Sequence, residues 1–360
     1  MDHGLRRSRL AERLSALGID AVIVTRLPNV RYLTGFTGSN GQAIVGADGS
    51  AVFLTDGRYD EQSSHEVPDL PRTAYTQGYP QPLVDACRTL GAARVAFERR
   101  GLTYDAWERL SQLGEGLELV PADDEVERLR RAKDANEVAL IARAQGFADQ
   151  AFEEVVLNGG LRAGVTERVL ARELEDAMLD AGADDRSFDP IVAFGEHAAE
   201  PHHHVTDRGL APGDVVKLDF GALSGGYHSD MTRTVAFGEP DARLRKIRDL
   251  VAEAQRAGVE AVRPGVSSVD VDAAARSVIA AAGHADAFPH GLGHGVGLEI
   301  HEDPFLRWDA GEKLVDGMVV TIEPGVYIPG LGGVRIEDMV EVTADGRREI
   351  PRSTRELIVL

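Results

Sequence analysis

The sequence predicts an α/β (α+β) protein in two parts: a small three-layer α/β domain over residues 1–122, then a larger domain over residues 123–360 with approximate two-fold symmetry. Three observations support this prediction. Strand-like and helix-like segments alternate over the first part, as in layered α/β domains. Pro121-Ala-Asp-Asp124 and a charged stretch end that alternation. Beyond them, a helix–helix–strand–hairpin pattern occurs twice.

The first part opens with an amphipathic helix pattern from Leu5 to Leu17, which Gly18 ends. Short apolar runs then indicate strands, and longer amphipathic stretches between them indicate helices. The expected strands cover residues 20–25, 51–55, 94–98 and 117–120, and the expected helices cover residues 81–90 and 103–113.

The second part starts with a long amphipathic helix from Asp134 to about Leu157, which Asn158-Gly-Gly160 ends. Thr166 is the expected N-cap of a second helix, because a threonine hydroxyl can accept from the free N–H groups of the first turn. This helix reaches about residue 180. Two further helices are expected over residues 241–262 and 267–282, and strand signals fill the segments between and after the helix pairs.

One stretch of the second part occurs twice. The first copy contains Gly213-Asp-Val-Val-Lys-Leu-Asp219 followed by Asp230, and the second contains Gly317-Met-Val-Val-Thr-Ile-Glu323 followed by Glu337. In each copy the first carboxylate lies six residues after the glycine, and the second follows across a glycine-containing turn. Two such units would pack with approximate two-fold symmetry.

The repeated carboxylates Asp219, Asp230, Glu323 and Glu337 are expected to converge as a metal site. A buried carboxylate is costly without a cation, and four converging carboxylates would repel one another until they bind protons or metal. Oxygen ligands suit divalent cations such as Mn²⁺, Mg²⁺ or Co²⁺. His294 lies between glycines that allow close backbone approach, and it adds a candidate imidazole ligand.

The repeat divides the four carboxylates into two equivalent pairs, Asp219 with Glu323 and Asp230 with Glu337. If one pair bridges two ions, the other pair should bind them terminally. Two divalent ions about 3.5–4 Å apart would share a hydroxide and polarise a carbonyl group, which is the two-metal route to hydrolysis.

Histidines and one arginine lie close to these carboxylates in sequence. His290 and His301 flank the candidate imidazole ligand, and Pro201-His-His-His204 precedes the first repeated strand. A histidine can stabilise a developing oxyanion or transfer a proton near neutral pH. Arg335 lies two residues before the last repeated carboxylate, where its guanidinium can orient a carboxylate through two parallel hydrogen bonds.

Composition argues against several other classes of protein. With 59 acidic and 39 basic residues, the formal charge is −20, so nucleic acid is not an expected partner. No stretch approaches the roughly 18 apolar residues of a membrane span, and no apolar run typical of a signal peptide follows the N-terminus. The single cysteine, Cys87, cannot form an internal disulfide, which favours a cytoplasmic location.

Five motifs occur in order along the second part: Leu218-Asp-Phe-Gly221, Ser229-Asp-Met-Thr-Arg-Thr234, Gly293-His-Gly-Val-Gly297, Ile322-Glu-Pro-Gly325 and Arg335-Ile-Glu-Asp338. Together they resemble the pita-bread metallopeptidases, and most of all the Xaa-Pro peptidases aminopeptidase P and prolidase. In the first part, residues 29–38 and 54–59 resemble the creatinase-type N-terminal domain. The resemblance therefore covers essentially the whole chain.

The resemblance implies a centre of two divalent metal ions per chain, with Mn²⁺ favoured over Co²⁺ or Zn²⁺. The implied ligands are Asp219, Asp230, His294, Glu323 and Glu337, of which Asp230 and Glu337 bridge both ions. The implied substrate-contacting histidines are His202, His290 and His301, and Glu323 is also a candidate proton shuttle. A homodimer is implied as well, in which the first domain of one subunit limits access to its partner's active site.

The activity that the resemblance implies is hydrolysis of the Xaa-Pro bond at the N-terminus of short proline-containing peptides. Three alternatives share the fold: a creatinase-like hydrolase, a non-enzymatic binding protein and a methionine aminopeptidase. The first two lack the metal ligands that are intact here, and the third normally lacks a creatinase-type first domain.

One difference between this sequence and the prolidase pattern favours aminopeptidase P over prolidase. Some prolidases carry an arginine four residues after the histidine that matches His301, and a dipeptidase needs a cationic group for the free carboxylate of its substrate. This chain has His301-Glu-Asp-Pro-Phe305, so an aromatic ring replaces that charge. Arg307 lies nearby, which keeps the dipeptidase as the alternative.

Overall fold

The computed structural model describes residues 1–360, which divide into two compact units, Met1–Arg130 and Arg131–Leu360. The sequence suggested a boundary after residue 122 instead. The difference is helix α6 (Glu125–Arg130), because the Glu125 carboxylate accepts a 2.7 Å hydrogen bond from Arg13 of helix α1 (His3–Ala16). Helix α6 therefore packs with the first unit.

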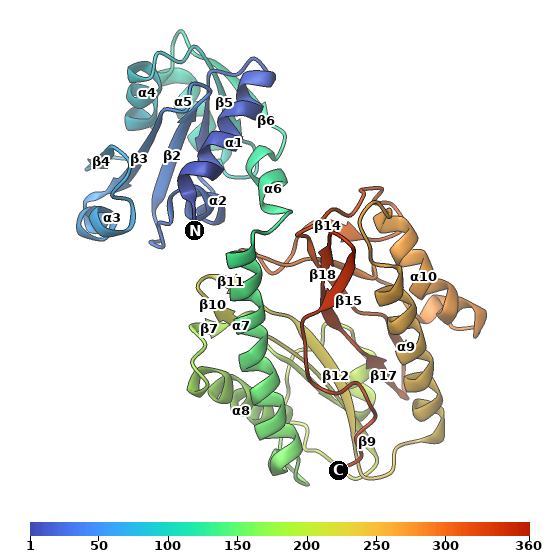
Figure 1. Cartoon of the computed structure of the whole chain (residues 1–360). Coiled ribbons are helices and arrows are strands. Elements are labelled where there is room, and N and C mark those ends of the chain that lie inside the picture. The colour runs from blue at the N-terminus through green and yellow to red at the C-terminus, as the bar shows by residue number, and fades with distance from the viewer. The chain divides into compact units, whose positions relative to one another are not determined.

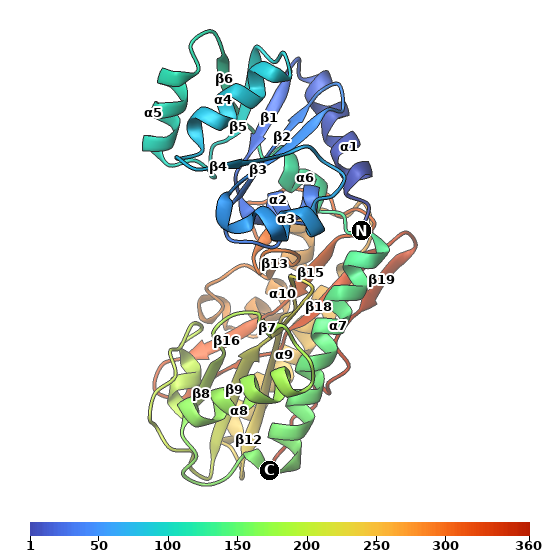
Figure 2. The same ribbon diagram turned by 90° about the vertical axis from the view of Figure 1, so that its left-hand side faces the viewer.

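The first unit is built on a six-stranded sheet with the order β4-β3-β2-β1-β5-β6 (Figure 1). Its strands are β1 (Ala21–Val24), β2 (Gly41–Gly46), β3 (Ala51–Asp56), β4 (Arg72–Tyr75), β5 (Arg94–Glu98) and β6 (Glu118–Ala122). Its other helices are α2 (Leu27–Thr34), α3 (Asp60–Glu66), α4 (Pro80–Thr89) and α5 (Tyr104–Leu113). Helix α1 covers one face of the sheet and helices α4 and α5 cover the other (Figure 2), which confirms the predicted three-layer α/β unit.

Five elements of the first unit were not expected from the sequence: α2, α3, α6, β2 and β4. Helix α2 lies largely within the motif of residues 29–38, where Pro28 occupies its first turn and Gly35, at a φ of 84°, ends it. Strand β2 is buried along its whole length and has a glycine at each end. Glycine weakens a strand pattern in sequence, whereas burial between two neighbouring strands stabilises it here.

The second unit contains the helix pairs and the hairpins that the sequence predicted. Its first half comprises α7 (Ala135–Ala151), α8 (Glu167–Asp180), β7 (Asp185–Arg186), β8 (Ile191–Phe194), β9 (Asp214–Phe220), β10 (Ala222–Ser224), β11 (Tyr227–His228) and β12 (Met231–Phe237). Its second half comprises α9 (Ala242–Ala261), α10 (Ser268–Ala281), β13 (Gly293–Gly295), β14 (Glu302–Leu306), β15 (Val319–Ile322), β16 (Gly325–Ile328), β17 (Gly332–Arg335), β18 (Asp338–Thr343) and β19 (Gly346–Glu349).

Both halves have the same order of elements, a helix pair followed by antiparallel strands. Strand β9 pairs with β12 and brings Asp219 opposite Thr232. Strand β15 pairs with β18 and brings Ile322 opposite Asp338. The chain turns in the second half differ in length from those of the first, but the repeated helix–helix–strand–hairpin unit is present twice.

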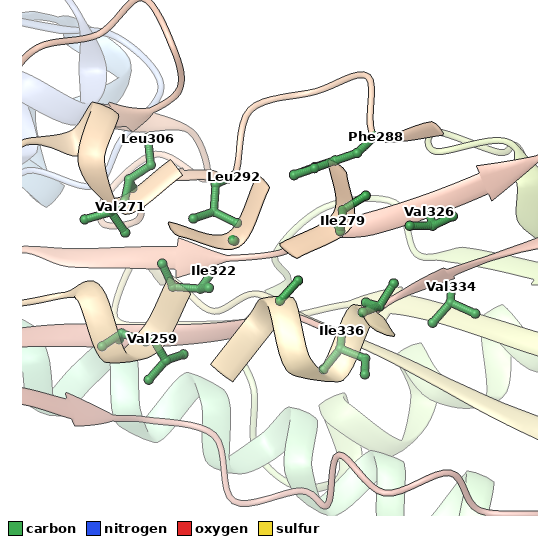
Figure 3. Packing of buried hydrophobic residues seen from close by; sticks show 14 of the residues in the cluster. Val259, Val271, Ile279, Phe288, Leu292, Leu306, Ile322, Val326, Val334 and Ile336 are labelled. Carbon is green, nitrogen blue, oxygen red and sulfur yellow. The ribbon is translucent and has the colours of Figure 1, made fainter. Parts of the chain in front are cut away.

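A large hydrophobic core lies between helices α9 and α10 and the strands of the second half (Figure 3). Val259, Val271 and Ile279 of the helices pack into the same cluster as Ile322 of β15 and Ile336, which follows β17. The cluster fixes the ends of these strands, which is where two of the repeated carboxylates lie. None of the helices has the length and apolar character that crossing a membrane requires.

Candidate metal centre and active site

Strand alternation places the first two repeated carboxylates. Leu218 and Phe220 on β9 are buried in the hydrophobic cluster of the first half, so Asp219 between them points to the opposite side of the strand. Asp230 immediately precedes β12, whose first residue, Met231, belongs to the same cluster.

The second pair of carboxylates is placed in the same way. Ile322 ends β15 and Ile336 follows β17, and both are buried in the core of the second half (Figure 3). Glu323 and Glu337 come directly after them in the chain. Each carboxylate therefore has an apolar neighbour that anchors the backbone on the other side.

These strands open onto a cavity of about 750 Å³ within the second unit. The structure brings every site residue suggested by the sequence to its wall: His202, Asp219, Asp230, His290, His294, His301, Glu323, Arg335 and Glu337. The residues come from segments separated by up to 135 positions, and the two halves each supply two of the four carboxylates.

Among the histidines of the cavity, His294 lies closest to the carboxylates. Potential ligand atoms of His294, Asp230 and Glu337 all lie within 4.8 Å of one another. The Nε2 atom of His294 is 3.4 Å from an oxygen of Glu323 and 3.6 Å from an oxygen of Asp230. Its Nδ1 atom lies 3.1 Å from the carbonyl oxygen of Gly295, so a proton on Nδ1 donates there and leaves the lone pair of Nε2 facing the carboxylates.

Burial disfavours charge on these groups in the metal-free protein. Burial, followed by the nearby carboxylates, raises the pKa of Asp230 and that of Glu337 well above their usual values. Burial also raises the pKa of Glu323 to about 7 and lowers the pKa of His294 to about 3. A cation among them would offset the burial and the mutual repulsion, which is the arrangement expected of metal ligands.

Asp219 supplies a further observation that fits a metal. Its Oδ2 atom accepts a short hydrogen bond from Arg335, but its buried Oδ1 atom has no hydrogen-bond partner. A buried carboxylate oxygen without a donor is costly, and a divalent ion would satisfy it. The donor set of four carboxylates and one neutral imidazole therefore suits hard or borderline divalent cations.

All three guanidinium nitrogens of Arg335 donate hydrogen bonds to other residues of the protein. Its Nε donates to the hydroxyl of Thr232 at 2.9 Å, and its Nη1 lies 3.2 Å from both the Pro201 carbonyl oxygen and the Tyr327 hydroxyl. Only Nη2 contacts a carboxylate, that of Asp219. Arg335 thus orients one carboxylate through a single nitrogen, and the rest of its guanidinium ties together three strands and a loop.

The three histidines expected to contact substrate differ in their surroundings. His290 donates from Nδ1 to the Gly291 carbonyl at 2.8 Å, so its Nε2 accepts from the Tyr327 hydroxyl at 3.0 Å. His301 packs edge-to-face on His294, with ring centroids 4.3 Å apart. His202 and His301 are exposed at the cavity wall, and neither ring forms a hydrogen bond.

The structure adds polar residues that the sequence did not single out. Tyr327 and Thr232 both contact Arg335, and the Thr232 hydroxyl also donates to Glu337 at 2.7 Å. Lys217 is completely buried. A signal for Lys217 exists in the sequence, because it lies two residues before Asp219 and therefore on the same face of β9.

A second cluster of ionisable side chains, Glu167, His197 and His203, includes the residue directly after His202. The Glu167 carboxylate accepts from the Phe194 and Thr206 backbone N–H groups, each at 2.9 Å, and from the Thr206 hydroxyl at 2.7 Å. It also lies 2.8 Å from a ring nitrogen of His197 and 2.9 Å from one of His203. Because donors already occupy both oxygens of Glu167, this cluster fits a hydrogen-bond network better than a metal site.

This network should make stability depend on pH. Burial alone would raise the pKa of Glu167, but hydrogen bonds from Thr206, His203 and Phe194 outweigh it and lower the pKa to about 2. The charged carboxylate therefore stabilises the fold above about pH 4.5, and this contribution, on the order of 3 kcal/mol, is lost as the pH falls towards 2. We expect Glu167→Gln to lower the free energy of unfolding at pH 7, with the difference from wild type shrinking between pH 4.5 and 2. Urea unfolding at several pH values measures this, and a constant difference would contradict it.

Residues 139–344 match the sequence pattern of Metallopeptidase family M24. The chain belongs to this family. Residues 6–132 match the Creatinase/Prolidase N-terminal domain, so both parts of the resemblance seen in the sequence are confirmed. As a member of family M24 the chain is a metallopeptidase, and a non-enzymatic binding protein is set aside.

Several relatives match this chain over nearly its whole length. The Xaa-Pro dipeptidase of Pyrococcus furiosus is 35% identical over 98% of this chain and 99% of its own. The structure of an Xaa-Pro dipeptidase from Bacillus anthracis is 38% identical, has a TM-score of 0.96 and covers 99% of this chain and 100% of its own. An X-Pro aminopeptidase structure from Thermotoga maritima is 33% identical, has a TM-score of 0.88 and covers 97% of this chain and 100% of its own.

Proposed function

We propose that this metallopeptidase hydrolyses the Xaa-Pro bond of short peptides and that its preferred substrates are Xaa-Pro dipeptides. The observation that carries the proposal is that the five motifs of the second unit meet in one cavity, beside an apolar wall and the guanidinium of Arg307. The apolar wall is formed by Phe188, Pro190, Ile191, Ile300 and Phe305. Such a surface suits the pyrrolidine ring of proline.

The preference for dipeptides departs from the aminopeptidase P that the sequence favoured. Phe305 occupies the position where some prolidases carry an arginine, but Arg307 lines the same cavity. Its side chain is 49% exposed and pairs at 2.7 Å with Asp309, which is itself exposed. The Arg307 guanidinium can therefore turn to a substrate carboxylate at small cost. The Xaa-Pro dipeptidases among the relatives support the same choice.

The five proposed metal ligands are Asp219, Asp230, His294, Glu323 and Glu337, with Asp230 and Glu337 shared between two ions. The cluster of Asp230, His294 and Glu337 and the partnerless oxygen of Asp219 support this assignment. When bound, the ions would supply Lewis-acid polarisation of the scissile carbonyl and lower the pKa of the attacking water.

The remaining roles belong to side chains of this chain. We assign His202 and His301, whose rings are free at the cavity wall, to donate hydrogen bonds to the oxyanion that develops on the scissile carbonyl. Glu323 takes the proton of the attacking water and passes it to the departing proline nitrogen. Arg335 fixes Asp219, and the His290 ring orients the Tyr327 hydroxyl.

Composition and family likeness support the other parts of the proposal. Mn²⁺ suits an oxygen-rich donor set with one imidazole. The creatinase-type first unit supports a homodimer in which that unit limits access to the site. The single cysteine, Cys87, is buried and free, in keeping with a cytoplasmic protein.

A substrate comparison tests the dipeptide preference. We expect a higher kcat/KM for alanyl-proline than for alanyl-prolyl-alanine. Arg307→Ala should raise the KM for the dipeptide about 10-fold, because a charge-assisted hydrogen bond to its carboxylate is lost. The tripeptide, whose carboxylate lies one residue further away, should be much less affected. Arg243→Ala, an exposed arginine outside the cavity, is the control. A preference for the tripeptide that Arg307→Ala leaves unchanged would favour aminopeptidase P instead.

A further inference from the structure

The loop that carries His202, residues 198–206, is held on both sides of that histidine. We call it the His202 loop. The His202 side chain is exposed at the cavity wall and forms no hydrogen bond of its own. The position of its ring therefore depends on how firmly the backbone around it is fixed.

On the upstream side, a buried lysine holds the loop. Lys217 lies in the middle of β9, is 0% exposed, and donates from Nζ to the carbonyl oxygens of Ala198 and Pro201 at 3.3 Å each. It also donates to the carbonyl oxygen of Glu200. The Pro201 carbonyl additionally accepts from Arg335 at 3.2 Å, so two side chains donate to the residue directly before His202.

On the downstream side, a buried anion holds the loop. Glu167 is at the start of α8, and its side chain is 0% exposed. One of its carboxylate oxygens binds the ring of His203, the residue directly after His202, and both the backbone N–H and the hydroxyl of Thr206. The other oxygen accepts from the Phe194 N–H at the end of β8, which ties the loop to the sheet.

Neither buried side chain lines the cavity. Lys217 is not exposed in the cavity, and Glu167 does not line it. Buried polar groups are costly unless they are hydrogen-bonded, and the only segment to which both of these side chains form hydrogen bonds is the His202 loop. Lys217 supplies donors to carbonyl groups before His202, whereas Glu167 supplies an acceptor for N–H and O–H groups after it.

We infer that Glu167 and Lys217 are positioning residues, which hold His202 at the distance from the metal ligands that its contact with the substrate needs. This inference rests on the proposed function for the role of His202, but not for the holding of the loop. The alternative is that both residues stabilise the fold without any bearing on His202. The two readings differ in what the variants do in the absence of His202.

A double-mutant cycle separates them. We expect Glu167→Gln and Lys217→Met each to lower kcat on alanyl-proline by about 10- to 100-fold, because small displacements of a catalytic group have effects of this size. Bound metal per chain should stay at the wild-type value. In the His202→Ala background, the same changes should lower kcat by less than a further factor of about 3, because the group that they position is already gone. Fully additive losses would overturn the inference.

The control is a carboxylate with a similar task elsewhere in the second unit. Asp149 on α7 accepts from the backbone N–H groups of Arg352 and Ser353 and from the Ser353 hydroxyl, and so holds a different loop. We expect Asp149→Asn to lower the melting temperature but to leave kcat within about 2-fold. A loss of kcat in Asp149→Asn as large as in Glu167→Gln would show that loosening any loop has the same effect, against the inference.

Hydrogen exchange of the metal-free protein gives a readout that needs no activity. The amides of Phe194 and Thr206, which donate to Glu167, should exchange at least about 10-fold faster in Glu167→Gln and at the wild-type rate in Asp149→Asn. If Glu167→Gln does not fold, Thr206→Val removes a single donor and should increase exchange of the Phe194 amide and reduce kcat in the same direction. A wild-type enzyme inactive on alanyl-proline would refute the proposed function. Unchanged exchange in Glu167→Gln would refute the holding of the loop, whatever the activity.

Discussion

Replacing Asp230 or Glu337 with alanine should remove at least one bound ion per chain and nearly all peptidase activity. Potential ligand atoms of both carboxylates lie within 4.8 Å of one of the His294 ring. Burial, followed by the charges of nearby carboxylates, raises the pKa of each well above its usual value in the metal-free protein. Losing one of them leaves three acidic groups with too little charge and too few ligand atoms for two ions. We expect turnover to fall by more than about 10³-fold, beyond the cost of one oxyanion donor.

Metal analysis of the purified variants, together with alanyl-proline hydrolysis, measures this loss. Glu341→Ala is the matched control, because Glu341 lies on β18 only four residues after Glu337 and pairs with Arg348 outside the cavity. Two ions per chain and normal turnover in Asp230→Ala or Glu337→Ala would refute the ligand assignment. A fall in both quantities in Glu341→Ala would instead indicate a general loss of the fold.

His301→Ala should separate catalysis from metal binding. The His301 ring packs on His294 with centroids 4.3 Å apart, yet it forms no hydrogen bond and faces the cavity. If it donates to the oxyanion of the transition state, its loss should lower kcat by about 10²–10³-fold. The metal content should remain that of the wild type, because the donor atoms of the ligand cluster belong to other residues.

The measurement is kcat on alanyl-proline beside the metal content of the same preparation. His284→Ala, which removes a histidine that does not line the cavity, should leave both unchanged. A drop in metal content in His301→Ala would make this histidine a ligand and would overturn its assignment to the substrate.

Much of the second unit could be predicted from its sequence because the informative residues recur. The repeated glycine-to-carboxylate spacing predicted two equivalent strands, and β9 and β15 carry it. Thr166 predicted the start of α8, and its hydroxyl does accept from the Val169 N–H. Signals of this kind act over a few residues, so a single sequence contains them.

The partners of individual side chains could not be predicted in the same way. Arg335 was expected to form two hydrogen bonds to one carboxylate. Only one of its guanidinium nitrogens donates to Asp219, and the other two donate to Thr232, Pro201 and Tyr327. Up to 134 residues of chain separate these pairs. Which of many polar groups meet depends on how the strands pack, and short-range patterns do not contain that information.

Strand β2 and helix α2 show the same limit at the level of whole elements. The glycines at the ends of β2 weaken its strand pattern, and its burial between β1 and β3 stabilises it only once the sheet exists. Helix α2 is eight residues long, too short for a clear amphipathic period. Tertiary contacts therefore stabilise both elements, and the local sequence pattern does not predict them.

The repeat in the second unit also bears on how such a centre can arise. Each half supplies two of the four carboxylates, so two identical half-length chains would bring all four together at the two-fold axis of a homodimer. A gene duplication followed by fusion is therefore a sufficient route to this centre, and an ancestor of half the length could already have bound metal. Once fused, the copies were free to diverge, and they have done so: His202 comes from the first half alone and His294 from the second.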